Sequence, residues 1–340
     1  MMRNIGLNFY ILVLLVIFCN IAHATTGFGS LTDSNIEYVG RWDKCDKNVF
    51  RSYWGGAYLK VTFTGRTIKI KLAKAANIYV SVDGLGYKKY SNAKGVVDLT
   101  PNILQNEIHT LVVVANYAND EIHFQGFILE KEGITLAQPE KDIIEFVGNS
   151  ITSGQNTTMG NLSAYPWLTG EALQVDHTQI SQPGITLVDG YYYNANWAPK
   201  RGQSVQYFLM KTSNHEISST WNFSVYTPKV LVINIGTNDY NLKVPNELFE
   251  STYQLFVQRI RRKYPNTEIF LMETFAGYYT EEIRNVVNMC LDSGDSKIHF
   301  VETKNWLLKP NDYVDQNHPN DIGHKKIAEK LSEVLKDYIN

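Results

Sequence analysis

The chain has 340 residues, with 32 Lys and Arg against 34 Asp and Glu, a formal charge of −2 and 44% hydrophobic residues. This length predicts about two domains, and the apolar content excludes a disordered chain because it supplies enough side chains for sizeable cores. The near-neutral charge argues against a nucleic-acid partner, which needs basic surface to displace counterions from phosphates.

Residues 1–24 predict a secretory signal peptide. They carry one charged residue, Arg3, followed by an apolar run at 9–18 and the small residues Ala22 and Ala24. The apolar run is too short to span a bilayer comfortably, and the small residues suit cleavage by signal peptidase. We therefore expect a secreted protein without stable membrane association. An uncleaved membrane anchor is the alternative.

Residues 25–137 predict an all-β sandwich. At 59–64 and again at 68–72, apolar and polar residues alternate at every step, which turns one face of each strand to a core and the other to water. Turn residues recur between short strands, and no long helical pattern interrupts them. Further strands are expected at 78–82, 111–114 and 122–129.

Residues 138–340 predict a three-layer α/β/α domain with a parallel sheet. The runs at 143–147 and 230–235 are continuously apolar, which is typical of parallel strands covered on both faces. Such sheets bind ligands beyond the carboxyl ends of their strands. Shorter strands are expected at 270–272 and 299–301, and amphipathic helices between Pro245 and Pro265 and around 327–335.

The two cysteines beyond the signal peptide are Cys45 and Cys290. In an oxidising compartment they could form a disulfide, and two buried thiols are the alternative. Two cysteines without a cluster of histidines argue against a structural zinc site. We expect neither a metal nor a cofactor.

Two motifs place polar side chains at the ends of the two apolar strands. The first strand runs into Gly-Asn-Ser at 148–150, which puts Ser150 at a strand-to-helix turn where backbone N–H groups can stabilise an oxyanion. Taken alone, Ser150 would equally be an ordinary helix N-cap. The second strand ends in Gly-Thr-Asn-Asp at 236–239, where Asn238 can donate to an oxyanion or close an Asx-turn.

A third motif lies near the end of the chain, where Asp315 precedes His318 by three residues. In a tight turn the carboxylate can hold one imidazole nitrogen, which fixes the tautomer and leaves the other nitrogen free as a base. Such a pair alone is usually a solvated loop. Together with Ser150 and Asn238, at strand ends of one domain, it indicates acyl transfer by a serine nucleophile.

These motifs resemble those of the SGNH (GDSL-like) hydrolases, in the same order and spacing. Within that superfamily the chain is similar to the two-domain acetylesterases of carbohydrate esterase family two, which carry a jelly-roll sandwich before a flavodoxin-like α/β/α hydrolase domain. The resemblance covers essentially the whole chain after the signal peptide. Supporting stretches are Gly-Arg-Trp-Asp at 40–43, Trp-Asn-Phe at 221–223, Phe-Ala-Gly-Tyr at 275–278, Thr-Lys-Asn-Trp-Leu at 303–307 and Gly-His-x-x-Ile-Ala at 323–328.

The resemblance implies a role for each motif residue. Ser150 is expected to be the nucleophile, His318 the general base and Asp315 the acid that orients it. Asn238 and the backbone N–H of Ser150 are the expected oxyanion donors. Asp239 and Trp197 are the candidate substrate-binding residues.

The chain departs from the family pattern at two places. Asn149 stands where the first motif usually has Asp, which removes a charge beside the nucleophile. At 181–184 the chain has Ser-Gln-Pro-Gly where a Ser-Gly pair normally supplies a backbone donor. The expected donor is the N–H of Gln182, with Gly184 as the next candidate. The aromatic cluster at 191–193 and Trp197 either stack on a sugar or pack under a long loop.

The function that the resemblance implies is that of a secreted, monomeric carbohydrate O-acetylesterase. Its expected substrate is acetylated plant cell-wall polysaccharide or oligosaccharide, with no nucleic-acid partner. One alternative is a lipase or thioesterase acting on other acyl esters, against which the sandwich and the lack of an apolar lid-like helix count. The other is a non-catalytic carbohydrate-binding protein, against which the intact Ser150, Asn238 and His318 count.

Overall fold

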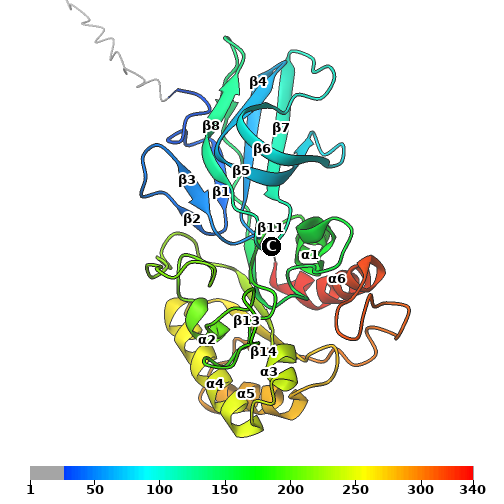
Figure 1. The fold of residues 1–340 in the computed structure, drawn as a ribbon. Coiled ribbons are helices and arrows are strands. Elements are labelled where there is room, and N and C mark those ends of the chain that lie inside the picture. The colour runs from blue at the N-terminus through cyan, green and yellow to red at the C-terminus, as the bar shows by residue number, and fades with distance from the viewer. Residues whose placement is uncertain (1–26, 340) are drawn as a thin grey trace, which may run out of the picture.

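The computed structural model describes residues 27–339, and the predicted signal peptide at 1–24 lies outside the described residues. A β-sandwich and an α/β domain lie one above the other in Figure 1. Between residues 27 and 339, none of the helices is both long and apolar enough to cross a membrane.

The sandwich consists of nine antiparallel strands joined into one nearly closed sheet. The strand order is β1-β4-β7-β5-β8-β3-β2, with β6 paired to β5 and β9 paired to β4. Apolar side chains alternate into its core, as the pattern at 59–64 and 68–72 predicts. The strands are β1 (Ile36–Val39), β2 (Trp42–Asp43), β3 (Phe50–Ser52), β4 (Tyr58–Gly65), β5 (Ile68–Val82), β6 (Lys88–Asp98), β7 (Glu107–Ala115), β8 (His123–Leu129) and β9 (Thr135–Leu136).

The segments 68–72 and 78–82, predicted as two strands, belong to the single strand β5. Its first part pairs with β8 and its last part with β7, while register shifts between Leu72 and Ile78 bend it. Such irregularities increase the local twist, which lets one strand serve both halves of a closed sheet. Strand β6 was not predicted, because most of its side chains are exposed and the sequence there lacks an apolar pattern.

The α/β domain has five parallel strands in the order β11-β10-β12-β13-β14. Its strands are β10 (Ile143–Gly148), β11 (Asp176–Ser181), β12 (Val230–Asn234), β13 (Glu268–Met272) and β14 (Ile298–Val301). Its helices are α1 (Tyr165–Leu173), α2 (Gln203–Gln206), α3 (Thr237–Asn241), α4 (Asn246–Lys263), α5 (Thr280–Asp292) and α6 (Asp321–Leu335), with 3-10 helices η1 (Gly160–Ser163) and η2 (Lys336–Tyr338).

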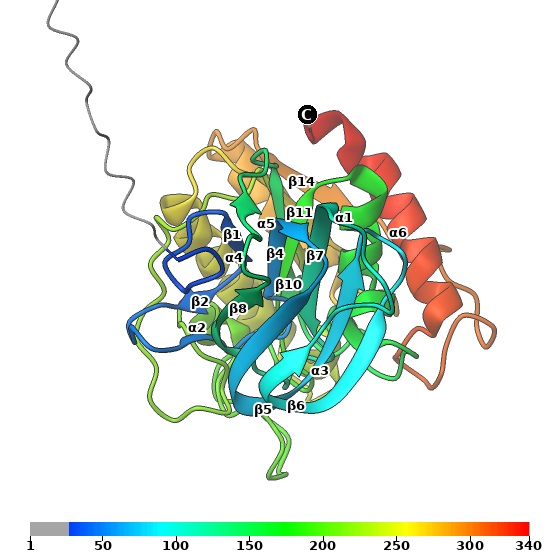
Figure 2. The same ribbon diagram turned by 90° about the horizontal axis from the view of Figure 1, so that it is seen from above.

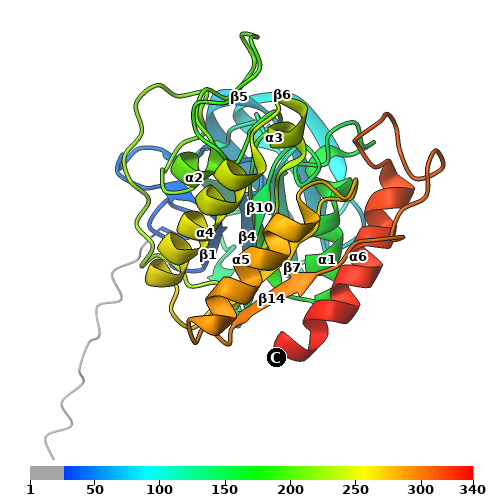
Figure 3. The same ribbon diagram turned by 90° about the horizontal axis from the view of Figure 1, so that it is seen from below.

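Helices cover both faces of the parallel sheet. Val230 and Val232 of β12 pack into the cluster with α1 and α6, whereas Leu231 and Ile233 pack into the cluster with α4 and α5. Because successive side chains of a strand point to opposite faces, the continuously apolar strand serves both clusters. Figure 3 shows α4 and α5 beside one another on one side and α6 on the other. The predicted fold class, a β-sandwich followed by a three-layer α/β domain, is confirmed.

Strand β11 was not predicted, because its residues, Asp-His-Thr-Gln-Ile-Ser, are mostly polar. In the structure nearly all of them are buried. Several of them lie against the sandwich, which covers the α/β domain when viewed from above in Figure 2. Lys60 binds Asp176 at 2.7 Å, and Thr178 donates to the carbonyl of Gly56 at 3.2 Å. A Cβ atom on Gly56 would lie 2.2 Å from the backbone nitrogen of Gln179, so glycine is required for this approach.

The thiols of Cys45 and Cys290 are both free, so the possible disulfide between them is not formed. Cys290 is buried in the core of the α/β domain, but Cys45 is exposed. The alternative of two buried thiols therefore holds for Cys290 alone.

Candidate active site

The predicted site residues gather where the connections of β10 and β12 diverge. Strands β11 and β12 lie on opposite sides of β10, and such a reversal of strand order opens a crevice at the carboxyl ends of the strands. Ser150 follows β10, Gln182 follows β11 and Asn238 follows β12.

Ser150 lies in a series of tight turns, because the helix α1 begins only at Tyr165. The prediction that Ser150 lies at a strand-to-helix turn is therefore wrong. Asn149 Oδ1 accepts the N–H of Ile151 at 3.0 Å, which forms an Asx-turn around the serine. A Cβ atom on Gly148 would lie 2.0 Å from Thr152 Oγ1, so the chain can close this turn only with glycine there.

The side chains of Ser150, His318 and Asp315 form a hydrogen-bonded line. Ser150 Oγ lies 2.9 Å from His318 Nε2, and His318 Nδ1 lies 2.8 Å from Asp315 Oδ2. An ionised carboxylate can only accept, so Nδ1 carries the proton and Nε2 is free to take one from the serine hydroxyl. This arrangement suits a serine nucleophile with an imidazole base.

A tight turn fixes the acid beside the imidazole. Asp315 Oδ1 accepts the backbone N–H groups of Asn317 and His318 at 2.9 and 2.8 Å. Partial burial alone would raise the pKa of Asp315, but these hydrogen bonds and the imidazole outweigh it and lower the pKa. The carboxylate therefore stays ionised. Asn156, for which the sequence predicts no role at this site, donates to Asp315 Oδ2 at 3.2 Å.

The amide of Asn238 is held from both ends. Its Nδ2 donates to the carbonyl of Ile185 at 2.8 Å, and its Oδ1 accepts the hydroxyl of Tyr193 at 3.1 Å. An amide nitrogen carries two hydrogens, and the second has no acceptor among residues 27–339. The backbone N–H of Ser150 likewise donates to no group in the described part of the chain. Both donors are available to an oxyanion.

Gln182 and Gly184 lie in the turn that follows β11. The side chain of Gln182 is buried, with its amide bonded to the segment at 213–214. Gly184 has a φ of 78°, and a Cβ atom there would lie 2.5 Å from the Trp197 ring. The geometry is compatible with a backbone donor in this turn.

Trp197 and Tyr193 form the aromatic edge of the site. Their ring centroids are 5.7 Å apart, and Trp197 is 62% exposed. Tyr193 reaches Asn238 with its hydroxyl, so the predicted tyrosine cluster contributes at least one side chain to the site. A ring that is exposed beside the candidate oxyanion donors can stack on a sugar.

The predicted role of Asp239 in binding substrate is wrong. Its side chain is fully buried, and its carboxylate accepts the backbone N–H groups of Leu187 and Val188. Burial raises the pKa of Asp239 to about 6, although these hydrogen bonds oppose the rise. An enclosed carboxylate cannot contact a substrate, so Asp239 shapes the loop after β11 and is not a substrate-binding residue.

His324, in the first turn of α6, is a structural residue. It is fully buried, and its Nδ1 accepts the backbone N–H of Tyr165 at 3.1 Å. Burial lowers the pKa of His324 to about 3. Within residues 27–339, no group of three or more His, Cys, Asp or Glu side chains is arranged to hold a metal ion.

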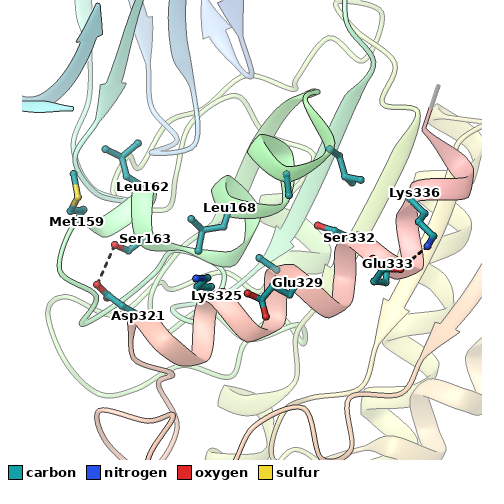
Figure 4. A pocket seen from close by; sticks show the side chains of 13 residues that line it. Met159, Leu162, Ser163, Leu168, Asp321, Lys325, Glu329, Ser332, Glu333 and Lys336 are labelled. Atoms are coloured by element: carbon teal, nitrogen blue, oxygen red, sulfur yellow. Dashed lines mark hydrogen bonds and ion pairs between the residues drawn. The ribbon is translucent and has the colours of Figure 1, made fainter. Parts of the chain in front are cut away.

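The cavity between α1 and α6, of about 750 Å³, contains none of the predicted site residues. Leu162 and Leu168 contribute apolar side chains to its wall, and Asp321, Lys325 and Glu329 line it from α6 (Figure 4). The chemistry is therefore expected at the strand ends and not in this cavity.

Two families match the chain. Residues 146–326 match the GDSL-like Lipase/Acylhydrolase family, and residues 38–139 match the family described as Carbohydrate esterase 2 N-terminal. The boundary between the two matches lies close to the change from antiparallel to parallel strands.

Two curated proteins that are similar to the chain are named as esterases. The chain is 27% identical over 330 residues to the cellulase/esterase CelE of Acetivibrio thermocellus, covering 89% of this chain and 39% of CelE. It is 23% identical over 279 residues to an acetylxylan esterase / glucomannan deacetylase of Cellvibrio japonicus, covering 73% of this chain and 75% of that protein. The chain thus spans about two fifths of the length of CelE.

Solved structures of similar proteins share the fold. A family two carbohydrate esterase from Clostridium thermocellum in complex with cellohexaose has a TM-score of 0.76 and 28% identity, covering 89% of this chain and 98% of that chain. An acetyl xylan esterase from Butyrivibrio proteoclasticus has a TM-score of 0.77 at 17% identity, covering 90% of this chain and 96% of that one, a likeness of fold alone.

Proposed function

The chain belongs to the GDSL-like lipase/acylhydrolase family, and from this premise we propose that it is a secreted carbohydrate O-acetylesterase with Ser150 as its nucleophile. The matches confirm the resemblance to this family and to carbohydrate esterase family two. The proposed substrate is acetylated plant cell-wall polysaccharide or oligosaccharide. We propose that the protein acts outside the cell, as a monomer without stable membrane association.

The observation that carries the proposal is the line from Ser150 Oγ through His318 to Asp315, with contacts of 2.9 and 2.8 Å. His318 Nε2 takes the hydroxyl proton while Ser150 Oγ attacks the acetyl carbonyl carbon. The oxyanion of the tetrahedral intermediate accepts hydrogen bonds from Asn238, the Ser150 N–H and the turn at 182–184.

Collapse of the intermediate breaks the bond to the sugar oxygen, which leaves with the proton from His318. The acetyl group remains on Ser150. Water then gives a proton to the same imidazole nitrogen and attacks the acyl carbon, which releases acetate and restores the serine. Asp315 keeps the proton on Nδ1 throughout.

Four observations support a carbohydrate as the acyl carrier. The sandwich at 38–139 matches an N-terminal domain named for carbohydrate esterases, and both curated relatives are named as esterases. The exposed ring of Trp197 lies beside Gly184 at the site, where it can stack on a sugar. The formal charge of −2 is compatible with an uncharged polysaccharide.

Comparison of nitrophenyl esters of increasing acyl length tests the acyl preference. We expect kcat/KM to be highest for the acetyl ester and to fall with each longer acyl group. A preference for long acyl chains would support a lipase or thioesterase and contradict the proposal. Product analysis on acetylated glucomannan and acetylated xylan then identifies the polysaccharide and the hydroxyl position.

A further inference from the structure

The sandwich holds a loop of the α/β domain that reaches the candidate active site. This loop, residues 207–221, follows α2 and doubles back on itself through backbone bonds between Met210 and Ser219 and between Trp221 and Phe208. Two side chains from the sandwich donate hydrogen bonds to the base of this loop. Arg41 donates to the carbonyl of Leu209 at 3.0 Å, and Trp54 Nε1 donates to the carbonyl of Met210 at 2.9 Å.

The tip of loop 207–221 is also bound to the sandwich. His215 Nε2 lies 2.6 Å from Glu121 Oε1, and Asn214 Nδ2 donates to Asn119 Oδ1 at 3.2 Å. The His215 ring also meets the Tyr53 ring edge-on, with centroids 4.8 Å apart. The side chains of Glu121 and His215 are 12% and 29% exposed, so their pair is partly shielded from water.

The same tip binds both ends of one side-chain amide in the active-site turn. Gln182 Oε1 accepts from Ser213 Oγ at 2.9 Å and from the Ser213 N–H at 3.2 Å, while Gln182 Nε2 donates to Asn214 Oδ1 at 2.9 Å. Gln182 is 2% exposed. Each polar atom of this amide is therefore bonded within the loop tip, which fixes where the side chain and its backbone lie.

The backbone held in this way lies next to the nucleophile. Gln182 follows Ser181, which pairs with Gly148 across β10 and β11 and accepts a hydrogen bond from Ser153 Oγ at 3.0 Å. A displacement of Gln182 would therefore move the oxyanion donors of the turn at 182–184 relative to Ser150.

We propose that the contacts of Asn119 and Glu121 with Asn214 and His215, passed on through Ser213 and Asn214 to Gln182, form a positioning network by which the sandwich sets the oxyanion donor of the α/β domain. This inference rests on the proposed function. The sandwich then contributes to the chemical step without touching the substrate. It also gives a role to Gln182 at a position where the family usually has glycine, since the side-chain amide makes the bonds to the loop tip.

His215→Ala tests the network, with His123→Ala as the matched control. Both imidazoles use Nε2 to contact the Glu121 carboxylate, His215 at Oε1 and His123 at Oε2, but only His215 lies on the loop that binds Gln182. We expect His215→Ala to lower kcat for nitrophenyl acetate about tenfold with KM unchanged, less than the about 10²–10³-fold cost of losing a whole donor. His123→Ala should keep the kcat of the wild-type protein.

A second readout separates positioning from general loss of structure. Phenylboronic acid forms a tetrahedral adduct on a serine nucleophile, so its inhibition constant should weaken by the same factor as kcat in His215→Ala. Asn119→Ala, which removes a contact at the protein surface, should give a smaller change of the same kind and remains informative if His215→Ala fails to fold.

Equal kcat values for folded His215→Ala, Asn119→Ala and the wild-type protein would overturn the network while leaving the proposed function intact. Equal losses in His215→Ala and His123→Ala would also overturn it, because the effect would then come from Glu121 and not from the loop. A wild-type protein without turnover would overturn both, since no oxyanion would need positioning.

Discussion

At the scale of single residues, the candidate site combines one local contact with several long-range ones. Asp315 and His318 are three positions apart and meet through a turn, whereas Ser150 and His318 are 168 positions apart and meet only because the fold brings two loops together. The tight turn around Asp315 keeps the imidazole aligned with the serine hydroxyl. The turn therefore places Asp315 against His318, and the fold places His318 against Ser150.

Asp315→Asn is expected to slow deacetylation without stopping it. An asparagine can still contact His318 Nδ1, but it cannot stabilise the imidazolium as a carboxylate does. The loss in kcat should be smaller than the about 10²–10⁴-fold that a positioned base contributes. The measurement is kcat for nitrophenyl acetate, and an unchanged rate would show that another group holds the imidazole.

Tyr193→Phe tests whether the orientation of the Asn238 amide matters. The variant removes the hydroxyl that donates to Asn238 Oδ1 but keeps the ring beside Trp197. One hydrogen bond is worth about 0.5–1.5 kcal/mol net, so we expect kcat to fall about 2- to 10-fold while KM stays the same. An unchanged kcat would mean that the bond to Ile185 alone orients the amide.

Sequence motifs were enough to predict that Ser150, Asp315 and His318 would meet and that Asn238 would follow the neighbouring strand, because each motif ends a predicted strand or forms a tight turn. The contact between Tyr193 and Asn238 spans 45 positions and follows no periodic pattern, so nothing in the local sequence indicates it. The buried state of Asp239 was missed for the same reason, since its partners lie on the loop after a strand that was not predicted.

At the scale of secondary-structure elements, the close approach of the sandwich to β11 is the least predictable feature. The polar sequence of β11 does not indicate a buried strand, and its burial becomes intelligible only when the sandwich supplies partners such as Lys60 for Asp176. Strands β10 and β12 were predicted because their side chains are almost all apolar. A strand that helices cover on both faces has this composition, so its burial can be read from its own residues without knowledge of the sandwich.

Gly56→Ala is expected to destabilise the contact between the sandwich and β11. The added methyl group would lie 2.2 Å from the backbone nitrogen of Gln179, which no side-chain movement can relieve. We expect a clear fall in Tm by calorimetry. Gly27→Ala is the control, because a methyl group there meets nothing within 4 Å. Equal Tm values for the two variants would show that the two parts are not packed this closely.

At the scale of the whole molecule, buried histidines make the fold sensitive to acid. His177 of β11 lies between the rings of Tyr58 and Trp167, and burial lowers its pKa to about 4. The unfolded chain binds a proton at this residue below its ordinary pKa of about 6.5, whereas the folded protein does so only near pH 4. Its contribution to stability is therefore complete above about pH 6.5 and is lost as the pH falls toward 4.

His177→Phe should reduce this dependence, since phenylalanine keeps a ring between Tyr58 and Trp167 but binds no proton. Between pH 7.5 and 4.5 we expect the free energy of unfolding to fall by about 2–3 kcal/mol less in the variant than in the wild-type protein. Urea denaturation at both pH values measures the difference. Parallel losses in the two proteins would contradict the account of His177.

The central claim, that Ser150 is the nucleophile of a carbohydrate deacetylase, is tested most directly by measuring acetate released from acetylated glucomannan by the wild-type protein and by Ser150→Ala. The account predicts steady acetate release by the wild-type protein. It predicts near-complete loss in Ser150→Ala, whose Tm should be unchanged. Equal acetate release by a folded Ser150→Ala protein would contradict the account.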